Sequence, residues 1–140
     1  MDTDKFYTLR GYSRRQQSLV SAAMEDYLEM IYRSVDKQGF VRLKTLASQL
    51  HVTPSASSKM VNRLKDQGLV EFEPYGIIRL TEDGELLGHT LYHRHEVLHR
   101  FFCRLNHAEN QLELVEKIEH FIDPQTIHNM EQFLQRTQEE

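Results

Sequence analysis

The apolar residues of this chain recur at helical spacing over several stretches. Residues 22–37 predict an amphipathic helix, with apolar positions at Met24, Tyr27, Leu28, Ile31 and Val35. The same spacing predicts a long helix over 82–105 and shorter helices over 109–122 and 124–138. The chain is therefore expected to be mainly α-helical.

A block with a different pattern lies between the first of these helices and the long one. Residues 40–42 are extended in character, and Thr53 followed by Pro54 is a typical helix start. Pro74-Tyr75-Gly76 is a turn signal between two β-like runs. The elements predicted here are helices over 43–50 and 54–67 and strands over 69–73 and 77–81. This order indicates a DNA-binding winged helix-turn-helix with a small β-hairpin wing. A small α+β core without a DNA role is the alternative.

Length and composition narrow the class of protein. The chain has 140 residues, 39% of them apolar and 27% charged, which is typical of one soluble domain or two small units. No stretch approaches the roughly 20 apolar residues of a membrane span, and the first residues lack the apolar core of a secretory signal. A single cysteine, Cys103, excludes an internal disulfide framework and a cysteine-rich zinc site. We therefore expect a cytoplasmic protein without a membrane partner.

Charge is distributed unevenly along the chain. The net charge is −4, but residues 39–80 carry +3 and residues 81–140 carry −7, while residues 1–38 are neutral. Seven of the eight histidines follow residue 88. A basic segment suits the phosphates of nucleic acid, and acids together with histidines suit a divalent cation.

These patterns divide the chain into three parts. Residues 1–20, with Arg10, Arg14 and Arg15, are expected to form a flexible basic arm. Residues 21–81 form the predicted winged helix-turn-helix DNA-binding domain. Residues 82–140 form a helical domain whose extra helices are expected to serve dimerisation and metal sensing.

Two carboxylates stand apart on the first predicted helix. At about 100° per residue, Asp26 and Glu29 lie on the side opposite the apolar stripe. Because the stripe must face the winged-helix core, the two acids face either water or a second structural unit.

The helix predicted over 109–122 carries a second group of this kind. Glu116, Glu119 and His120 share the face opposite its apolar residues, and His95 lies on the long helix before it. Each piece alone is most often a solvated surface. Together they offer four carboxylates and two imidazoles, which suit an octahedral Mn²⁺ or Fe²⁺ site better than a tetrahedral thiolate zinc site.

These motifs, with their order and gaps, resemble the manganese transport regulators of the diphtheria-toxin-repressor family of metal-dependent transcriptional repressors. The resemblance runs from about residue 22 to the C-terminus. It rests on MEDYLEMIY at 24–32, PSASSKMV at 54–61, RHE at 94–96 and EKIEH at 116–120. Such sequences often carry a second histidine after the last motif, where this chain has Phe121.

The resemblance implies a homodimeric repressor that binds operator DNA when metal is bound. It also implies a binuclear Mn²⁺ site, two ions per protomer, that joins the two domains. The implied metal ligands are Asp26, Glu29, His95, Glu116, Glu119 and His120. In this interpretation, the bound metal fixes the recognition helices of a dimer about 34–36 Å apart, one turn of duplex.

The expected DNA contacts come from the start of the second helix of the helix-turn-helix and from the wing tip. These residues are Thr53, Pro54, Ser55, Ala56, Ser57, Lys59, Arg63 and Tyr75. Serine and alanine suit modest hydrogen bonds and thymine-methyl contacts, while the basic residues suit bases and phosphates.

Three alternatives remain at this point. Paired carboxylates with a histidine could activate water on a metal, as in a hydrolase. However, the sequence has no nucleophile arrangement, no phosphate-binding glycine loop and no H-E-x-x-H motif, so we expect neither an enzyme nor an organic cofactor. A winged-helix regulator could instead sense a small molecule. The metal could also be Fe²⁺ or Zn²⁺ in place of Mn²⁺.

Overall fold

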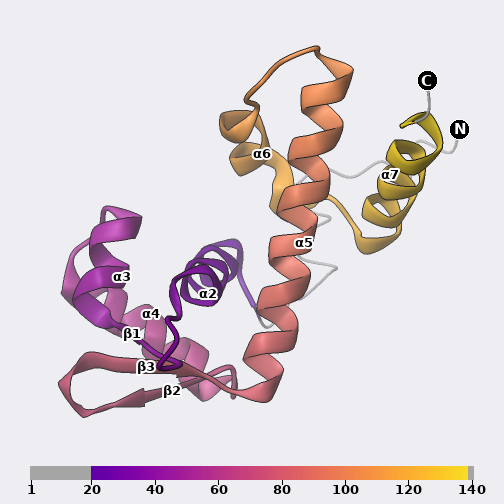
Figure 1. Cartoon of the computed structure of the whole chain (residues 1–140). Helices are drawn as coiled ribbons and strands as arrows, with labels where there is room; N and C mark the ends of the chain where they lie inside the picture. Colours follow the sequence, from indigo (N-terminus) through magenta and orange to yellow (C-terminus); the bar gives the residue numbers. More distant parts are fainter. Residues whose placement is uncertain (1–19, 139–140) are drawn as a thin grey trace, which may run out of the picture.

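The computed structural model describes residues 20–138, which form two units joined by one long helix (Figure 1). The first unit comprises α2 (Ala22–Ser34), β1 (Val41–Arg42), α3 (Leu43–Leu50), α4 (Pro54–Asp66), β2 (Val70–Glu73) and β3 (Ile77–Leu80). The second comprises α5 (Glu82–Leu105), α6 (Leu112–Ile118), the 3₁₀ turn η3 (Glu119–Phe121) and α7 (Pro124–Thr137). The mainly α-helical prediction, with a winged helix-turn-helix followed by a helical unit, is confirmed.

The sheet has three antiparallel strands in the order β1-β3-β2. The β2–β3 hairpin is the predicted wing, with Phe72 opposite Ile78. The extended residues before α3 add a short third strand, with Val41 on the other side of Ile78. Ile78 is fully buried, so the sheet is fixed to the unit through its central strand.

Two hydrophobic cores lie along the chain. The first joins α2, α3, α4 and the sheet, and its fully buried side chains include Leu28, Ile31, Leu46, Val61, Leu64 and Ile78. The second packs α5 against α6 and α7, and its buried side chains are Val97, Leu98, Val115, Ile127 and Leu134. Burying such side chains is the main source of stability for each unit.

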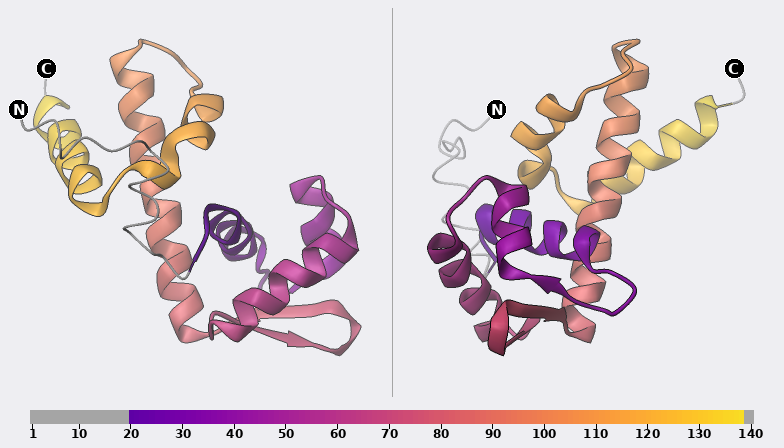
Figure 2. Two further views of the ribbon diagram at one scale, coloured as in Figure 1. Left: turned by 180° about the vertical axis from the view of Figure 1, so that it is seen from behind. Right: turned by 60° about the vertical axis from the view of Figure 1, so that its left-hand side comes forward.

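Helix α5 belongs to both cores. Leu91 near its middle packs into the first core, and Val97 and Leu98, less than two turns later, pack into the second. Figure 1 and Figure 2 show α5 as a continuous rod with α2 beside its first half and α6 and α7 around its second half. The boundary between the two cores therefore falls on α5 between these residues.

Side-chain caps set the predicted helix starts. The Thr53 hydroxyl accepts the backbone N–H of Ala56 at 3.1 Å at the start of α4. The Asp123 carboxylate accepts the N–H of Thr126 at 2.7 Å at the start of α7. The hydrogen bonds from Thr126 lower the pKa of Asp123.

The first predicted helix ends earlier than its apolar pattern suggests. Val35 leaves the helical conformation, and the N–H of Gly39 then bonds to the carbonyl of Asp36 at 2.9 Å. Gly39 has a φ of 85°, which glycine adopts without strain. The tight turn needs the residues after Ser34, so α2 stops there and not at residue 37.

The helix predicted over 109–122 is wrong at both ends. The Asn110 side chain accepts the N–H of Leu112 at 2.8 Å, and the N–H of Gln111 donates to His99 Nε2 at 3.2 Å, so α6 starts at Leu112. After Ile118, whose φ is −121°, the chain tightens into the 3₁₀ turn η3. Glu119 and His120 consequently lie on this turn and not on a continuous α-helix.

The arm predicted over 1–20 lies, apart from Val20, outside the described residues. Among residues 20–138, no helix combines the length and the apolarity that a membrane span requires.

We predict that Gly84→Ala destabilises the protein, although alanine normally favours a helix interior. An added Cβ at Gly84 would collide with the backbone carbonyl of Leu69, which closes the first unit against α5. The expected loss is about 1–3 kcal/mol of unfolding free energy. Urea denaturation measures it, with Glu85→Ala on the exposed side of α5 as the control. Equal or increased stability for Gly84→Ala would contradict the close packing.

Candidate metal centre

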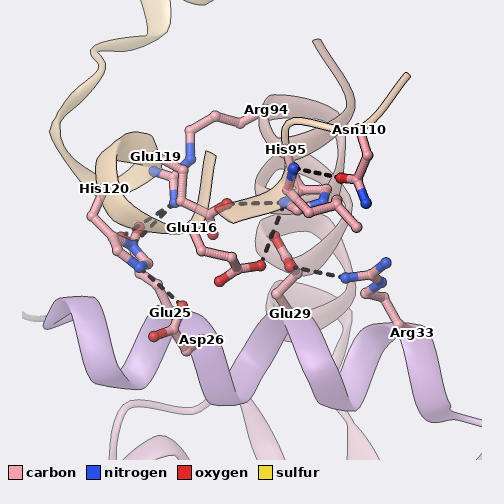
Figure 3. Close-up of polar contacts among 11 residues, drawn as sticks. Glu25, Asp26, Glu29, Arg33, Arg94, His95, Asn110, Glu116, Glu119 and His120 are labelled. Atoms are coloured by element: carbon pink, nitrogen blue, oxygen red, sulfur yellow. Dashed lines mark hydrogen bonds and ion pairs between the residues drawn. The ribbon is translucent and has the colours of Figure 1, made fainter. Parts of the chain in front are cut away.

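The predicted metal ligands meet where α2, α5 and η3 come together. In Figure 3, the acidic side of α2 faces the end of α6 and η3, and side chains of α5 lie between them. The site thus sits at the boundary between the two hydrophobic cores. Its donors come from residues more than ninety positions apart in the sequence.

One group of donors is fully enclosed. It consists of Glu29 from α2, His95 from α5 and Glu119 from η3, with one ligand atom of each within 4.8 Å of the others. All three side chains are buried. His95 Nδ1 donates to Glu119 Oε2 at 2.9 Å.

A second group lies beside the first and shares Glu119 with it. Its members are Asp26, Glu119 and His120, whose ligand atoms again lie within 4.8 Å of one another. His120 Nε2 donates to Asp26 Oδ1 at 2.9 Å. One carboxylate therefore belongs to two adjacent donor groups.

Glu116 stands at the edge of the enclosed group. Its Oε1 lies 3.9 Å from His95 Nδ1, and its side chain is half-exposed. Burial of part of the side chain and the nearby charge of Glu119 raise the pKa of Glu116. This carboxylate therefore lies beside the enclosed group without being a member of either donor group.

A buried oxygen of Glu29 without a hydrogen bond indicates that these donors fit a divalent cation. Glu29 Oε1 is buried and has no hydrogen-bond partner, and such orphaned acceptors are costly in a folded protein. The other oxygen of Glu29 lies 3.4 Å from the guanidinium of Arg33, at the outer edge of the site. The inner oxygen, Oε1, is therefore the one that lacks both this guanidinium and a hydrogen bond.

The pKa shifts in the enclosed group also indicate a place for a cation. Burial, and then the charge of Glu119, raise the pKa of Glu29 to about 7. The hydrogen bond to Glu119 raises the pKa of His95 against the opposing effect of burial. A cation bound here would relieve the repulsion that raises the pKa of Glu29 and would compete with protons for the same atoms.

Glu25 also contacts the site, although it was not among the residues predicted from the sequence. Its Oε1 accepts a hydrogen bond from His120 Nδ1 at 2.9 Å and lies 3.5 Å from Arg94. The bonds to Asp26 and Glu25 raise the pKa of His120 to about 10. The helical wheel contained the signal, because Glu25 is only about 40° from Glu29 around α2.

The structure brings all six sequence-predicted ligand candidates into one region. The neighbouring histidines of α5 are used elsewhere: His93 pairs with Glu131 at 3.0 Å, and His99 accepts the N–H of Gln111. Neither histidine belongs to a donor group among the described residues.

The predicted DNA contacts lie together at the start of α4 and on the wing. The exposed ones are Thr53, Pro54, Ser55, Ala56, Lys59, Arg63 and Tyr75. Tyr75 at the wing tip is 89% exposed. These side chains are free to meet a partner from solvent.

The prediction that Ser57 contacts DNA is wrong. Its side chain is fully buried, so it does not reach base edges. The reason is helical periodicity, since Ser57, Val61 and Leu64 are spaced i, i+4 and i+7 on the core side of α4.

Both halves of the chain match one protein family. Residues 19–78 match the iron dependent repressor N-terminal DNA binding domain. Residues 81–140 match the iron dependent repressor metal binding and dimerisation domain.

Two bacterial relatives are similar over most of their length. The chain is 35% identical over 118 residues to the HTH-type transcriptional regulator MntR of Lysinibacillus sphaericus (strain C3-41), covering 84% of this chain and 85% of that protein. It is 38% identical over 120 residues to the HTH-type transcriptional regulator MntR of Geobacillus thermodenitrificans (strain NG80-2), covering 84% of each.

Solved structures share the fold. The manganese regulator SloR superposes with a TM-score of 0.69 at 28% identity, covering 80% of this chain and 53% of that one. A manganese-dependent transcriptional repressor in complex with manganese gives a TM-score of 0.69 at 25% identity, covering 79% and 52%. This chain spans about half the length of these two proteins.

We predict that Glu29→Gln raises the melting temperature of the metal-free protein by a few degrees at about pH 8. The folded-state pKa of Glu29, about 7, lies above its ordinary value of 4.5, so the penalty on folding grows as the pH rises above about 4.5 and is complete above about pH 7. The difference should shrink as the pH falls from 7 and vanish near pH 4, where the carboxyl is protonated in both states.

Thermal unfolding followed by circular dichroism across this pH range measures the effect. Glu113→Gln on the exposed side of α6 removes the same charge and serves as the control. A variant that is no more stable than the wild type at about pH 8 would show that the buried carboxylate carries no such penalty.

Proposed function

The chain belongs to the iron-dependent repressor family and is a metal-dependent transcriptional repressor, and we propose that Mn²⁺ is the metal that activates it. The proposed ligands are Asp26, Glu29, His95, Glu116, Glu119 and His120. The observation that carries the proposal is the sharing of Glu119 between two donor groups that both reach α2.

The chemistry of the donors favours Mn²⁺. Four carboxylates and two imidazoles form an oxygen-rich set without a thiolate, which suits Mn²⁺ better than softer ions. Both relatives quoted above are named MntR, and two of the matching structures are described as manganese regulators. Two adjacent donor groups that share one carboxylate support two ions per protomer.

Metal binding is proposed to couple the two units through these side chains. A divalent cation supplies the positive charge that the carboxylates lack. Asp26 and Glu29 belong to α2 in the DNA-binding unit, while Glu119 and His120 belong to η3 in the second unit. When the four side chains share cations, one relative placement of the two units is favoured over the others, which is a population shift.

The second unit is proposed to form a homodimer. The match to a metal binding and dimerisation domain supports this, and so do exposed apolar side chains on α5, α6, η3 and α7. These residues are Leu86, Leu105, Leu112, Phe121 and Phe133. A dimer with a fixed placement of its DNA-binding units presents two recognition helices at a set spacing, which lowers the cost of binding operator DNA.

Residues 21–81 are proposed as the DNA-binding domain and residues 82–140 as the sensing and dimerisation domain. The proposed reading surface consists of exposed residues at the start of α4 and on the wing, namely Thr53, Pro54, Ser55, Ala56, Lys59 and Tyr75. Arg63, one turn further along α4, is placed to meet phosphates. We propose that the protein acts in the cytoplasm, where it meets chromosomal DNA.

The central prediction concerns the metal dependence of DNA binding. Duplex DNA is selected from a random library by the Mn²⁺-loaded protein and then titrated by fluorescence anisotropy. We expect tight binding with Mn²⁺ and at least tenfold weaker binding without metal, in line with allosteric couplings of about 1–3 kcal/mol. Asp26→Ala and Glu119→Ala should each abolish most of the Mn²⁺ response, because the first removes a proposed ligand of the DNA-binding unit and the second removes one of the helical unit.

Competition with Fe²⁺ under anaerobic conditions and with Zn²⁺ tests the choice of metal. Glu113→Ala is the matched control, since Glu113 is an exposed acid of the second unit outside both donor groups. DNA binding that is equally tight with and without metal would refute the coupling. A stronger response to Fe²⁺ or Zn²⁺ than to Mn²⁺ would refute the metal assignment alone.

A second prediction separates phosphate contacts from base contacts. Arg63→Gln should weaken binding to specific and non-specific duplexes by a similar factor, because a phosphate contact carries no sequence information. It should also reduce the slope of log affinity against log salt by about 1. Ser55→Ala should change the preferred sequence while leaving the slope unchanged. An unchanged slope in Arg63→Gln would place this residue away from the DNA.

A further inference from the structure

A polar cluster lies behind His120, on the side of the ring that faces away from Asp26. His120 Nδ1 donates to Glu25 Oε1 at 2.9 Å, and the guanidinium of Arg94 lies 3.5 Å from the same oxygen. Arg94 also lies 3.3 Å from His120 Nδ1. The side chains are 10%, 19% and 13% exposed for His120, Glu25 and Arg94, so the cluster is largely shielded from water.

The two ring nitrogens of His120 have different partners. Nδ1 faces Glu25, and Nε2 faces Asp26 at the same distance of 2.9 Å. Asp26 belongs to a donor group that could hold a metal, and Glu25 does not. A carboxylate that accepts the Nδ1 proton fixes the orientation and tautomer of the ring, so the lone pair available to a metal is that of Nε2.

Arg94 is suited to hold Glu25 in this position. It comes from α5, whereas Glu25 comes from α2 and His120 from η3, so the cluster joins three elements (Figure 3). The guanidinium and the Nδ1–H both face one carboxylate oxygen. The contact from Nδ1–H is a short charge-assisted hydrogen bond, and the guanidinium adds an ion pair at 3.5 Å. Without Arg94, Glu25 would have one fewer charged partner to fix its rotamer.

We propose that Glu25 and Arg94 are positioning residues of the metal centre. Glu25 accepts the Nδ1 proton of His120 and Arg94 holds Glu25, so that Nε2 is presented to the cation. The inference rests on the proposed Mn²⁺ site and adds to it two residues that do not contact the ion.

A simple charge effect makes the opposite prediction for Arg94. A positive side chain next to a cation site repels the cation, so its removal would tighten metal binding. If Arg94 acts through Glu25 and His120, its removal weakens metal binding. The sign of the change therefore distinguishes positioning from electrostatic repulsion.

The experiment is a Mn²⁺ titration of the full-length protein, with the free aqueous ion measured by electron paramagnetic resonance. The variants are Glu25→Ala, Glu25→Gln, Arg94→Gln and the exposed control Glu113→Ala. We expect Glu25→Ala to weaken one of the two ions about 10–100-fold and to leave the other nearly unchanged. The second ion should persist because Glu29, His95 and Glu119 remain intact.

The conservative variants sharpen the test. Glu25→Gln keeps an oxygen acceptor for Nδ1–H and should recover most of the lost affinity. Arg94→Gln should weaken the same ion several-fold. Melting temperatures of the metal-free variants identify any that fail to fold. If Glu25→Ala is one of them, Arg94→Gln decides against Glu113→Ala, because positioning predicts weaker binding of one ion and charge repulsion predicts tighter binding.

The outcomes are distinct. Wild-type affinities for both ions in Glu25→Ala, or tighter binding in Arg94→Gln, would overturn the positioning role and leave the Mn²⁺ site intact. Equal weakening of both ions would overturn it as well, because the effect would then not act through His120. A wild-type protein that takes up no Mn²⁺ would refute the proposed function and this inference together.

Discussion

The proposed response to metal depends on an excess of buried carboxylates between the two hydrophobic cores. Glu29 and Glu119 are both buried, and their mutual repulsion adds to the cost of removing each from water. Charged groups rarely occupy such a position unless a counter-charge is supplied. Two buried carboxylates therefore lower the stability of the cation-free protein. Binding of a cation removes this cost, so the protein can respond to the cation.

Helix α5 makes this arrangement possible. Leu91 anchors it in the first core and Val97 in the second, and His95 lies between them. The joint between the two units is consequently less than two helical turns wide, and it is polar where both neighbouring cores are apolar. The proposed change in the relative placement of the two units therefore falls at this polar joint, between the two cores.

Much of this architecture could be predicted from sequence, and the failures have physical reasons. Long helices and the wing followed from period and turn residues, because these features are local. The short turn at Glu119 and His120 was not predictable, since it depends on how the chain leaves α6 and enters the cap of α7. Ser57 and Glu25, in contrast, could have been placed from the helical wheel. Ser57 lies on the core side of α4, so its assignment to the DNA surface on residue type was wrong. Glu25 lies on the same side of α2 as Glu29, so its omission from the site was avoidable.

The 3₁₀ turn also explains how adjacent residues serve two donor groups. Glu119 points to His95 and Glu29, while His120 points to Asp26 and Glu25. The two arginines that contact this arrangement, Arg33 and Arg94, stand at its two outer edges. Within the described residues, the inner oxygen of Glu29 is left without such a partner. A guanidinium is too large to lie between these carboxylates without separating them, whereas a small divalent ion concentrates two charges at one point. Above the pKa of Glu29, about 7, the uncompensated charge is thus located where a small metal ion can neutralise it, and an ion held there by Glu29, His95 and Glu119 would join side chains from both units.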